Sequence, residues 1–216
     1  MKLECLVKYS HSQLLPVNKV IIWLHGLGAD YNDFVPLVKQ LGLEHNTKFI
    51  FPNAPLRPIT VNNGYVMRGW YDILALNQNI DATADVAGIN ASVAAIDELI
   101  TQEIAAGTAA KNIIIAGFSQ GGVISYIAGI KHQQQLGGII ALSTYIPAYD
   151  ELLGSISSSI PIFAAHGSND LVVPLKLGLL AYHKLVNSGF NITWHQYPME
   201  HSLCLEEIQH LSAWLQ

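Results

Sequence analysis

The chain contains few charged residues and only two cysteines, and each shortage excludes a class of function. Only 12% of the 216 residues are charged, and 11 Lys and Arg against 16 Asp and Glu give a net charge of −5 without a basic run. Proteins that bind nucleic acid neutralise its phosphates with clustered Lys and Arg, so nucleic acid is excluded as a partner. Cys5 and Cys204 are too few for a disulfide framework, and neither has the spacing of a paired metal ligand. Buried free thiols are typical of a reducing compartment, and we therefore expect a cytoplasmic protein.

The sequence also has no segment typical of export or of membrane insertion. Lys2, Glu4 and Lys8 occupy the region where a signal peptide has its apolar centre. Residues 112–130 carry no charge over about the length of a membrane span. Ser119-Gln120-Gly121-Gly122 interrupts that run, however, and its two halves are predicted as different elements. We expect a soluble protein.

Apolar sequence is abundant, since half of the residues are hydrophobic. Short runs rich in β-branched residues predict buried strands, and they alternate with stretches of helical periodicity. The predicted strands are 19–24, 48–51, 112–116, 138–142, 161–165 and 191–197, and the predicted helices are 33–41, 81–106, 121–130, 174–187 and 202–215. This alternation predicts an α/β fold in a single domain over residues 1–216, with a mostly parallel sheet covered by helices on both faces. Ligands of such sheets bind beyond the carboxyl ends of the strands.

Residues 54–78 interrupt the alternation, because they are long for a connection and show no sustained period. Within them, residues 59–67 are typical of a small hairpin with an Asn-Gly turn. The segment is either an excursion packed on the surface or a lid or apolar wall for a substrate, and we favour the second interpretation. Its candidate substrate-binding residues are Tyr65, Met67, Trp70 and Tyr71. Exposed apolar side chains here would also suit a transient contact with a membrane surface or a homodimer.

A candidate nucleophile lies between a predicted strand and a predicted helix. Gly117-Phe118-Ser119-Gln120-Gly121 is a G-x-S-x-G sequence at that boundary. A serine on a sharp strand-to-helix turn is held in a strained conformation, and the glycines let the neighbouring backbone pass closely. An ordinary glycine-rich turn is the alternative. The position between strand and helix favours Ser119 as a nucleophile.

A serine hydroxyl needs a base to accept its proton and a carboxylate to orient that base. In this type of fold the expected order along the chain is Ser, then Asp or Glu, then His. Asp170 and His201 follow the last two predicted strands and satisfy both the order and the placement. Asp150 and Glu151 follow a strand at a greater distance, and His166 precedes Asp170 and would invert the order.

The oxyanion of a tetrahedral intermediate needs prearranged donors. The residue after the nucleophile, Gln120, is expected to supply one backbone N–H, and the glycine-rich loop 25–30 after the first predicted strand a second. That loop has no Lys of a phosphate-binding loop and no complete dinucleotide-binding spacing. His25, His166 and His201 do not have the spacing of a zinc motif, so we expect neither a metal nor an organic cofactor.

Six stretches in this order resemble the acyl-protein thioesterase / phospholipase-carboxylesterase family of α/β-hydrolases. They are Trp23-Leu24-His25-Gly26-Leu27-Gly28, Arg68-Gly69-Trp70-Tyr71-Asp72, Gly117-Phe118-Ser119-Gln120-Gly121-Gly122, Leu142-Ser143-Thr144-Tyr145-Ile146-Pro147, His166-Gly167-Ser168-Asn169-Asp170 and His201-Ser202. The resemblance implies the catalytic triad Ser119, Asp170 and His201, and an oxyanion hole from the amides of Leu27 and Gln120. It also implies hydrolysis of carboxylic esters and thioesters of medium or long acyl chains, with the region around Trp70 bordering the acyl channel.

Two positions depart from the family pattern. Glu200 stands where relatives commonly have Gly before the histidine, and Tyr31 where a small residue is common. Neither belongs to the triad, but both bear on the substrate range. A different class of function, a non-catalytic module that binds acyl lipid or a membrane surface, would have no need of the triad pattern.

Overall fold

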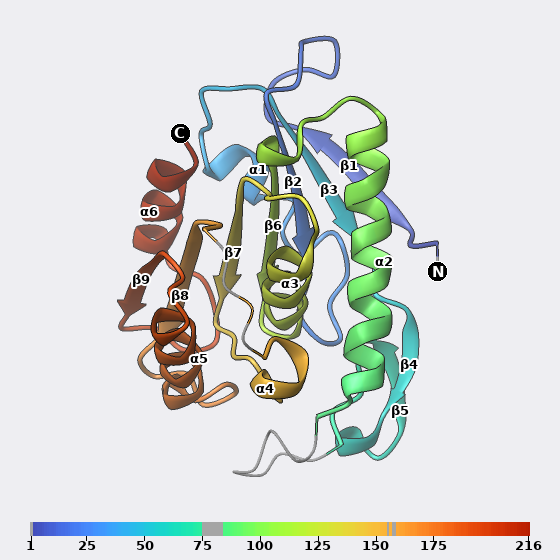
Figure 1. The fold of residues 1–216 in the computed structure, drawn as a ribbon, viewed down its shortest axis with the longest axis vertical. Helices are drawn as coiled ribbons and strands as arrows, with labels where there is room; N and C mark the ends of the chain where they lie inside the picture. Colours follow the sequence, from blue (N-terminus) through green and yellow to red (C-terminus); the bar gives the residue numbers. More distant parts are fainter. Residues whose placement is uncertain (1, 75–83, 155, 157–158) are drawn as a thin grey trace.

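The computed structural model describes residues 2–216 except 75–83, 155 and 157–158. Its centre is a seven-stranded sheet with the order β1-β3-β2-β6-β7-β8-β9 (Figure 1). β1 runs antiparallel to β3, and the other neighbouring strands are parallel. The strands are β1 (Cys5–Tyr9), β2 (Lys19–Leu24), β3 (Thr47–Pro52), β6 (Ile113–Phe118), β7 (Gly138–Leu142), β8 (Ile162–Gly167) and β9 (Ile192–Tyr197).

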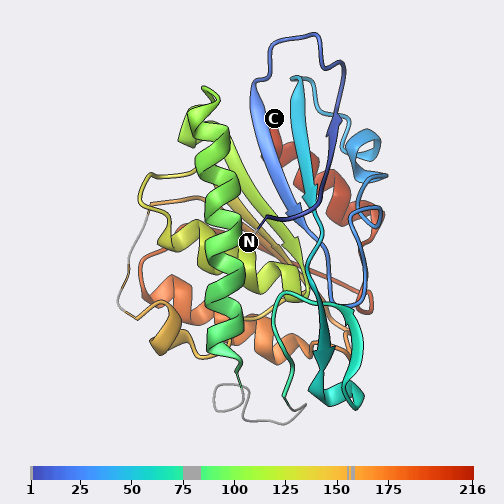
Figure 2. The ribbon, with the colours of Figure 1, turned by 90° about the vertical axis from the view of Figure 1, so that its right-hand side faces the viewer.

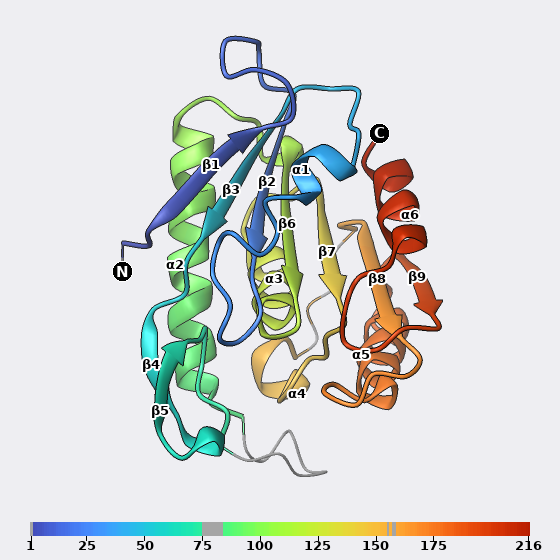
Figure 3. The same cartoon turned by 180° about the vertical axis from the view of Figure 1, so that it is seen from behind.

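Helices cover both faces of the sheet and make three layers (Figure 2). One face carries α2 (Val86–Ala105), α3 (Gln120–Lys131), α4 (Tyr149–Leu152) and α5 (Leu175–Asn187). The other carries α1 (Leu37–Gln40) and α6 (Leu205–Leu215), which lie in front of the sheet in Figure 3. The prediction of a mostly parallel sheet covered on both faces is therefore confirmed. Among the described residues, no helix combines the length and the apolar character needed to cross a membrane.

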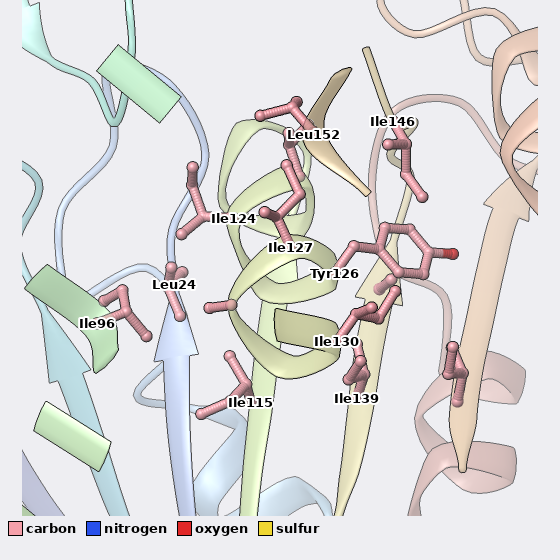
Figure 4. Packing of buried hydrophobic residues seen from close by; sticks show 14 of the residues in the cluster. Leu24, Ile96, Ile115, Ile124, Tyr126, Ile127, Ile130, Ile139, Ile146 and Leu152 are labelled. Atoms are coloured by element: carbon pink, nitrogen blue, oxygen red, sulfur yellow. The ribbon is translucent and has the colours of Figure 1, made fainter. Parts of the chain in front are cut away.

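The two faces of the sheet form two separate cores, because successive side chains of a strand point to opposite sides. In β6, Ile113 and Ile115 belong to the core under α2 and α3, whereas Ile114 belongs to the core under α1 and α6. Both faces are therefore buried, which is why the strands are continuously apolar in sequence. Figure 4 shows isoleucines of α3 packed over the strands; its labelled side chains include Ile115, Ile124, Ile127, Ile130 and Ile139.

Each strand and helix predicted from the sequence is present, with differences at the ends. The helix predicted over 33–41 is shortened to α1, because the chain before Leu37 forms turns. The helix predicted from residue 81 begins at Val86, where the Asp85 carboxylate accepts the N–H of Gly88 at 2.9 Å; residues 81–83 lie outside the described part. β1 was not predicted. It is an edge strand of mixed polarity whose pairing with β3 only the structure reveals.

The predicted hairpin is present as β4 (Leu56–Ile59) and β5 (Tyr65–Arg68), which pair antiparallel. The turn between them is longer than a two-residue turn, since a 3₁₀ turn, η1 (Thr60–Asn62), precedes Asn63 and Gly64, both at positive φ. The hairpin lies at the end of the molecule where the parallel strands end (Figure 1). Of the predicted excursion 54–78, residues 75–78 lie outside the described part.

Candidate active site

The order of the strands reverses between β2 and β6. The chain passes from β2 outward to β3 and returns through α2 to β6 on the other side of β2. In open α/β sheets this reversal leaves a crevice beyond the carboxyl ends of the two strands. The loop 25–30 follows β2 and Ser119 follows β6, so two of the predicted site segments meet at this point. A Cβ added to Gly26 would lie 3.5 Å from the Cβ of Ser119, which places the loop beside the serine.

Ser119 has the strained conformation that its sequence context predicts. Its φ of 53° and ψ of −119° lie in a region that residues other than Gly rarely adopt. The flanking glycines are required by packing, because a Cβ on Gly117 would lie 2.2 Å from the carbonyl oxygen of Gly121 and one on Gly121 would lie 2.5 Å from that of Leu24. The Ser119 backbone is held from β7, since its N–H donates to the carbonyl oxygen of Leu142 at 2.9 Å.

Asp170 and His201 are joined by a hydrogen bond. The Nδ1 of His201 lies 2.7 Å from the Oδ2 of Asp170, whose side chain is fully buried. The other carboxylate oxygen, Oδ1, accepts the backbone N–H groups of Val172 at 2.9 Å and Val173 at 2.8 Å. Three hydrogen bonds therefore fix the carboxylate, and a carboxylate so held orients the ring of its histidine. Gly167 lets the two loops approach, because a Cβ there would lie 2.4 Å from the carbonyl oxygen of Met199.

His201 lies beside the residue that precedes the serine. The ring centroids of Phe118 and His201 are 4.7 Å apart. Among the described residues the structure has no hydrogen bond between the Ser119 hydroxyl and the His201 ring. Such bonds are often long in enzymes without substrate and shorten in the reacting complex. The structure thus brings Asp170 to His201 and places the histidine ring against the turn that carries Ser119.

His166, which could be mistaken for the base, is buried behind Asp170. Its Nε2 lies 2.8 Å from the carbonyl oxygen of Val173 and 3.5 Å from the Oδ2 of Asp170. A carbonyl oxygen can only accept, so Nε2 carries the proton of the neutral ring. Burial lowers the pKa of His166, which keeps that ring uncharged at neutral pH. Its contacts are those of a residue that holds the loop carrying Asp170.

The candidate substrate-binding residues fall into two groups. Trp70 and Tyr71 are buried: the indole N–H of Trp70 donates to the carbonyl oxygen of His25 at 2.9 Å, and the Tyr71 hydroxyl lies 3.2 Å from that of Tyr145. Burial raises the pKa of Tyr71 well above its usual value, so this phenol remains protonated. Tyr65, in contrast, is 68% exposed on the hairpin. The partly buried Met67 faces the glycine-rich loop, since its Sδ would lie 3.5 Å from a Cβ on Gly28.

The sequence did not indicate the role of the Gln120 side chain. Its Oε1 accepts the N–H of Trp70 at 2.7 Å, and its Nε2 donates to the carbonyl oxygen of Tyr71 at 2.7 Å. The first residue of α3 is thereby attached to the backbone that follows the hairpin. Thr144 was also missed as a site residue: its hydroxyl donates to the carbonyl oxygen of Ser119 at 2.7 Å. Both side chains bond to backbone that is distant in sequence, so no local pattern could reveal them.

The two departures from the family pattern lie at the edges of the site. The Glu200 side chain is exposed, next to His201 in the chain. The backbone N–H of Tyr31 donates to the Oδ1 of Asn53 at 2.8 Å, which holds the end of the glycine-rich loop against β3. In the described part of the chain, no group of three or more His, Cys, Asp or Glu has the arrangement of a metal site.

Comparison with known proteins gives consistent results. The sequence profile of the phospholipase/carboxylesterase family matches residues 10–216. Acyl-protein thioesterase 1 of Yarrowia lipolytica is 39% identical over 206 residues, which cover 91% of this chain and 90% of that protein. The enzyme of the same name from Neurospora crassa is 40% identical over 207 residues, 90% of this chain and 84% of that protein. The crystal structure of Arabidopsis thaliana SOBER1 superimposes with a TM-score of 0.84 at 31% identity, covering 91% of this chain and 97% of that one.

Proposed function

This chain belongs to the phospholipase/carboxylesterase family and has its α/β-hydrolase fold, and from that premise we propose that it hydrolyses acyl esters or thioesters through an acyl-enzyme on Ser119. The observation that carries the proposal is the 2.7 Å hydrogen bond between Asp170 and His201 beside the strained turn that carries Ser119. The curated relatives are named thioesterases and a carboxylesterase, which supports the same class of reaction.

The three residues of the triad have different tasks. The Oγ of Ser119 attacks the acyl carbonyl carbon while the Nε2 of His201 accepts the hydroxyl proton. Asp170 keeps the other ring nitrogen protonated and stabilises the imidazolium that forms. The tetrahedral intermediate collapses as the bond to the alcohol or thiol breaks, and His201 returns the proton to that leaving group. Water then attacks the acyl-enzyme with His201 again as base, which releases the carboxylic acid and restores Ser119.

The negative charge on the acyl oxygen would be stabilised by the backbone N–H groups of Leu27 and Gln120. Gln120 begins α3, so its N–H has no acceptor within the helix. The helix N-terminus also contributes a favourable partial positive charge there. Each correctly placed donor of this kind contributes roughly 10²- to 10³-fold to the rate.

For the substrate, we propose a medium or long acyl chain attached to a protein or a lipid. The names of the fungal relatives support an acylated protein. The hairpin side chains Tyr65 and Val66 are exposed and apolar, which suits a donor that is held at a membrane surface. Liposome flotation of a variant with polar residues at 65 and 66 tests that contact, and unchanged flotation would exclude it.

The decisive experiment is the Ser119→Ala variant, assayed on p-nitrophenyl esters of two to sixteen carbons and on matched acyl thioesters. We expect turnover to disappear on every substrate while the circular dichroism spectrum and the melting temperature stay close to those of the wild type. A fluorophosphonate probe should label the wild type and not the variant. Retained turnover would exclude Ser119 as nucleophile, and an unlabelled, inactive wild type would favour the non-catalytic binding module.

A further inference from the structure

The peptide group between Gly26 and Leu27 is held from behind by a buried imidazole. The Nδ1 of His25 lies 2.7 Å from the carbonyl oxygen of Gly26, and its Nε2 lies 3.0 Å from the backbone N of Ala54. A backbone N–H can only donate, so Nε2 is the acceptor and carries no proton. The proton of the neutral ring is therefore on Nδ1, which donates to Gly26.

The environment keeps this ring in its neutral form. His25 is 1% exposed, and burial lowers its pKa more than the bond to Gly26 raises it. A protonated ring would also turn an N–H of its own toward the N–H of Ala54. The indole of Trp70 packs against the imidazole, with ring centroids 5.4 Å apart, and so limits its rotation. The tautomer and the orientation of His25 are both fixed.

The two N–H groups that follow Leu27 in the glycine-rich loop already donate to backbone carbonyl oxygens. The N–H of Gly28 donates to the carbonyl oxygen of Arg68 at 2.8 Å, and the N–H of Ala29 donates to that of Gly26 at 3.3 Å. The N–H of Leu27 has no acceptor in the part of the chain that the structure describes. The oxygen of the Gly26–Leu27 peptide thus accepts two hydrogen bonds, while its N–H is free for a ligand.

Resting on the proposed function, we infer that His25 is a positioning residue that aims the Leu27 N–H at the acyl oxygen of the substrate. The peptide bond is planar and trans, so fixing its carbonyl oxygen fixes the opposite direction of its N–H. A hydrogen bond to a peptide oxygen also polarises the group and strengthens its N–H as a donor. His25 acts through Leu27 and touches no reacting atom.

Two substitutions separate the two ring nitrogens. In His25→Asn the side-chain amide can replace Nδ1 as donor to Gly26 but cannot reach Ala54. In His25→Gln the side-chain oxygen can replace Nε2 as acceptor from Ala54, and nothing donates to Gly26. Because loss of one oxyanion donor costs roughly 10²- to 10³-fold in rate, we expect a displaced donor in His25→Gln to lower kcat about 10- to 100-fold, with KM within about threefold. His25→Asn should retain kcat within about fivefold of the wild type.

An alkyl trifluoromethyl ketone, which binds as a tetrahedral adduct, should lose affinity for His25→Gln by the same factor as kcat. Ile100→Ala, a core truncation in α2 away from the site, controls for lost stability and should leave kcat unchanged below its melting temperature. Equal losses in the Asn and Gln variants, or no loss in either, would overturn the role of His25. If a variant does not fold, ¹⁵N chemical shifts of His25 in the wild type decide instead, since a protonated Nε2 would contradict the inference. Ser119→Ala, assayed in parallel, shows separately whether the proposed hydrolysis itself fails.

Discussion

Glu207 is a carboxylic acid buried in the first turn of α6, just after the loop that carries His201, and its ionisation should destabilise the protein at high pH. The side chain is fully buried, and neither carboxylate oxygen has a hydrogen-bond partner among the described residues. Burial raises the pKa of Glu207 from 4.5 to about 8, against a smaller opposing effect of the nearby Cys204 backbone.

Whether rising pH stabilises or destabilises the protein depends on which state, native or unfolded, holds the Glu207 proton. Between pH 4.5 and about 8 the native protein keeps Glu207 protonated, whereas the unfolded chain has released that proton. Rising pH therefore favours the unfolded state over this interval. At about 1.4 kcal/mol per pH unit, the contribution of Glu207 falls by up to about 5 kcal/mol, on the order of a third or more of a typical domain stability.

Glu207→Gln removes this titration, and Glu206→Gln, at the exposed neighbouring position in the same turn, is the matched control. The free energy of unfolding is measured by urea denaturation at several pH values between 5 and 9. We expect Glu207→Gln to match the wild type near pH 5 and to become more stable than it by several kcal/mol at pH 9. Other titrating groups, such as the buried histidines, cancel in the difference between the two proteins. Parallel curves for wild type and Glu207→Gln would refute the reasoning.

Three further substitutions test the packing and hydrogen bonds around the site. Gly121→Ala would place a methyl group 2.5 Å from the carbonyl oxygen of Leu24, so we expect about 1–3 kcal/mol of lost stability and a large loss of turnover; near-normal values of both would contradict the close packing. Thr144→Val removes the bond to the Ser119 carbonyl, and kcat should fall several-fold with KM little changed, as steady-state kinetics would show. Asp85→Ala removes the cap of α2 and should lower the free energy of unfolding by about 1–2 kcal/mol in urea, with no change expected if the cap is idle.

The mostly parallel sheet could be predicted because the apolar runs that form its buried strands begin and end abruptly in the sequence. β2 was predicted with the correct bounds, since its apolar run starts at Lys19 and stops before His25. Ser119, Asp170 and His201 could be singled out from the sequence because each lies within four residues of the end of a strand. The carboxyl ends of parallel strands lie at the same edge of the sheet. A correct prediction of the strands is therefore enough to place these three residues near one another.

The rest depends on partners that are distant in sequence. From the sequence, the side chain of His25 has a role only in an unsuitable metal site and otherwise belongs to the glycine-rich loop. Its bond to Ala54 requires the approach of β2 and β3, so no local pattern could reveal it. Glu207 directly follows Glu206 and has the sequence of an exposed helix start, yet it is buried. That Trp70 borders the acyl channel stays a prediction, and the bond from its indole N–H to the carbonyl oxygen of His25 in the loop after β2 could not be predicted from the sequence.

Two hydrogen bonds between the Gln120 amide and the backbone of Trp70 and Tyr71 couple the base of the hairpin to the start of α3. A rotation of the whole hairpin about Trp70 would therefore also displace the N-terminus of α3 and the adjacent Ser119. Bending of the hairpin that leaves this attachment intact must therefore occur nearer the tip, around Asn63 and Gly64, where positive φ angles make the chain turn sharply.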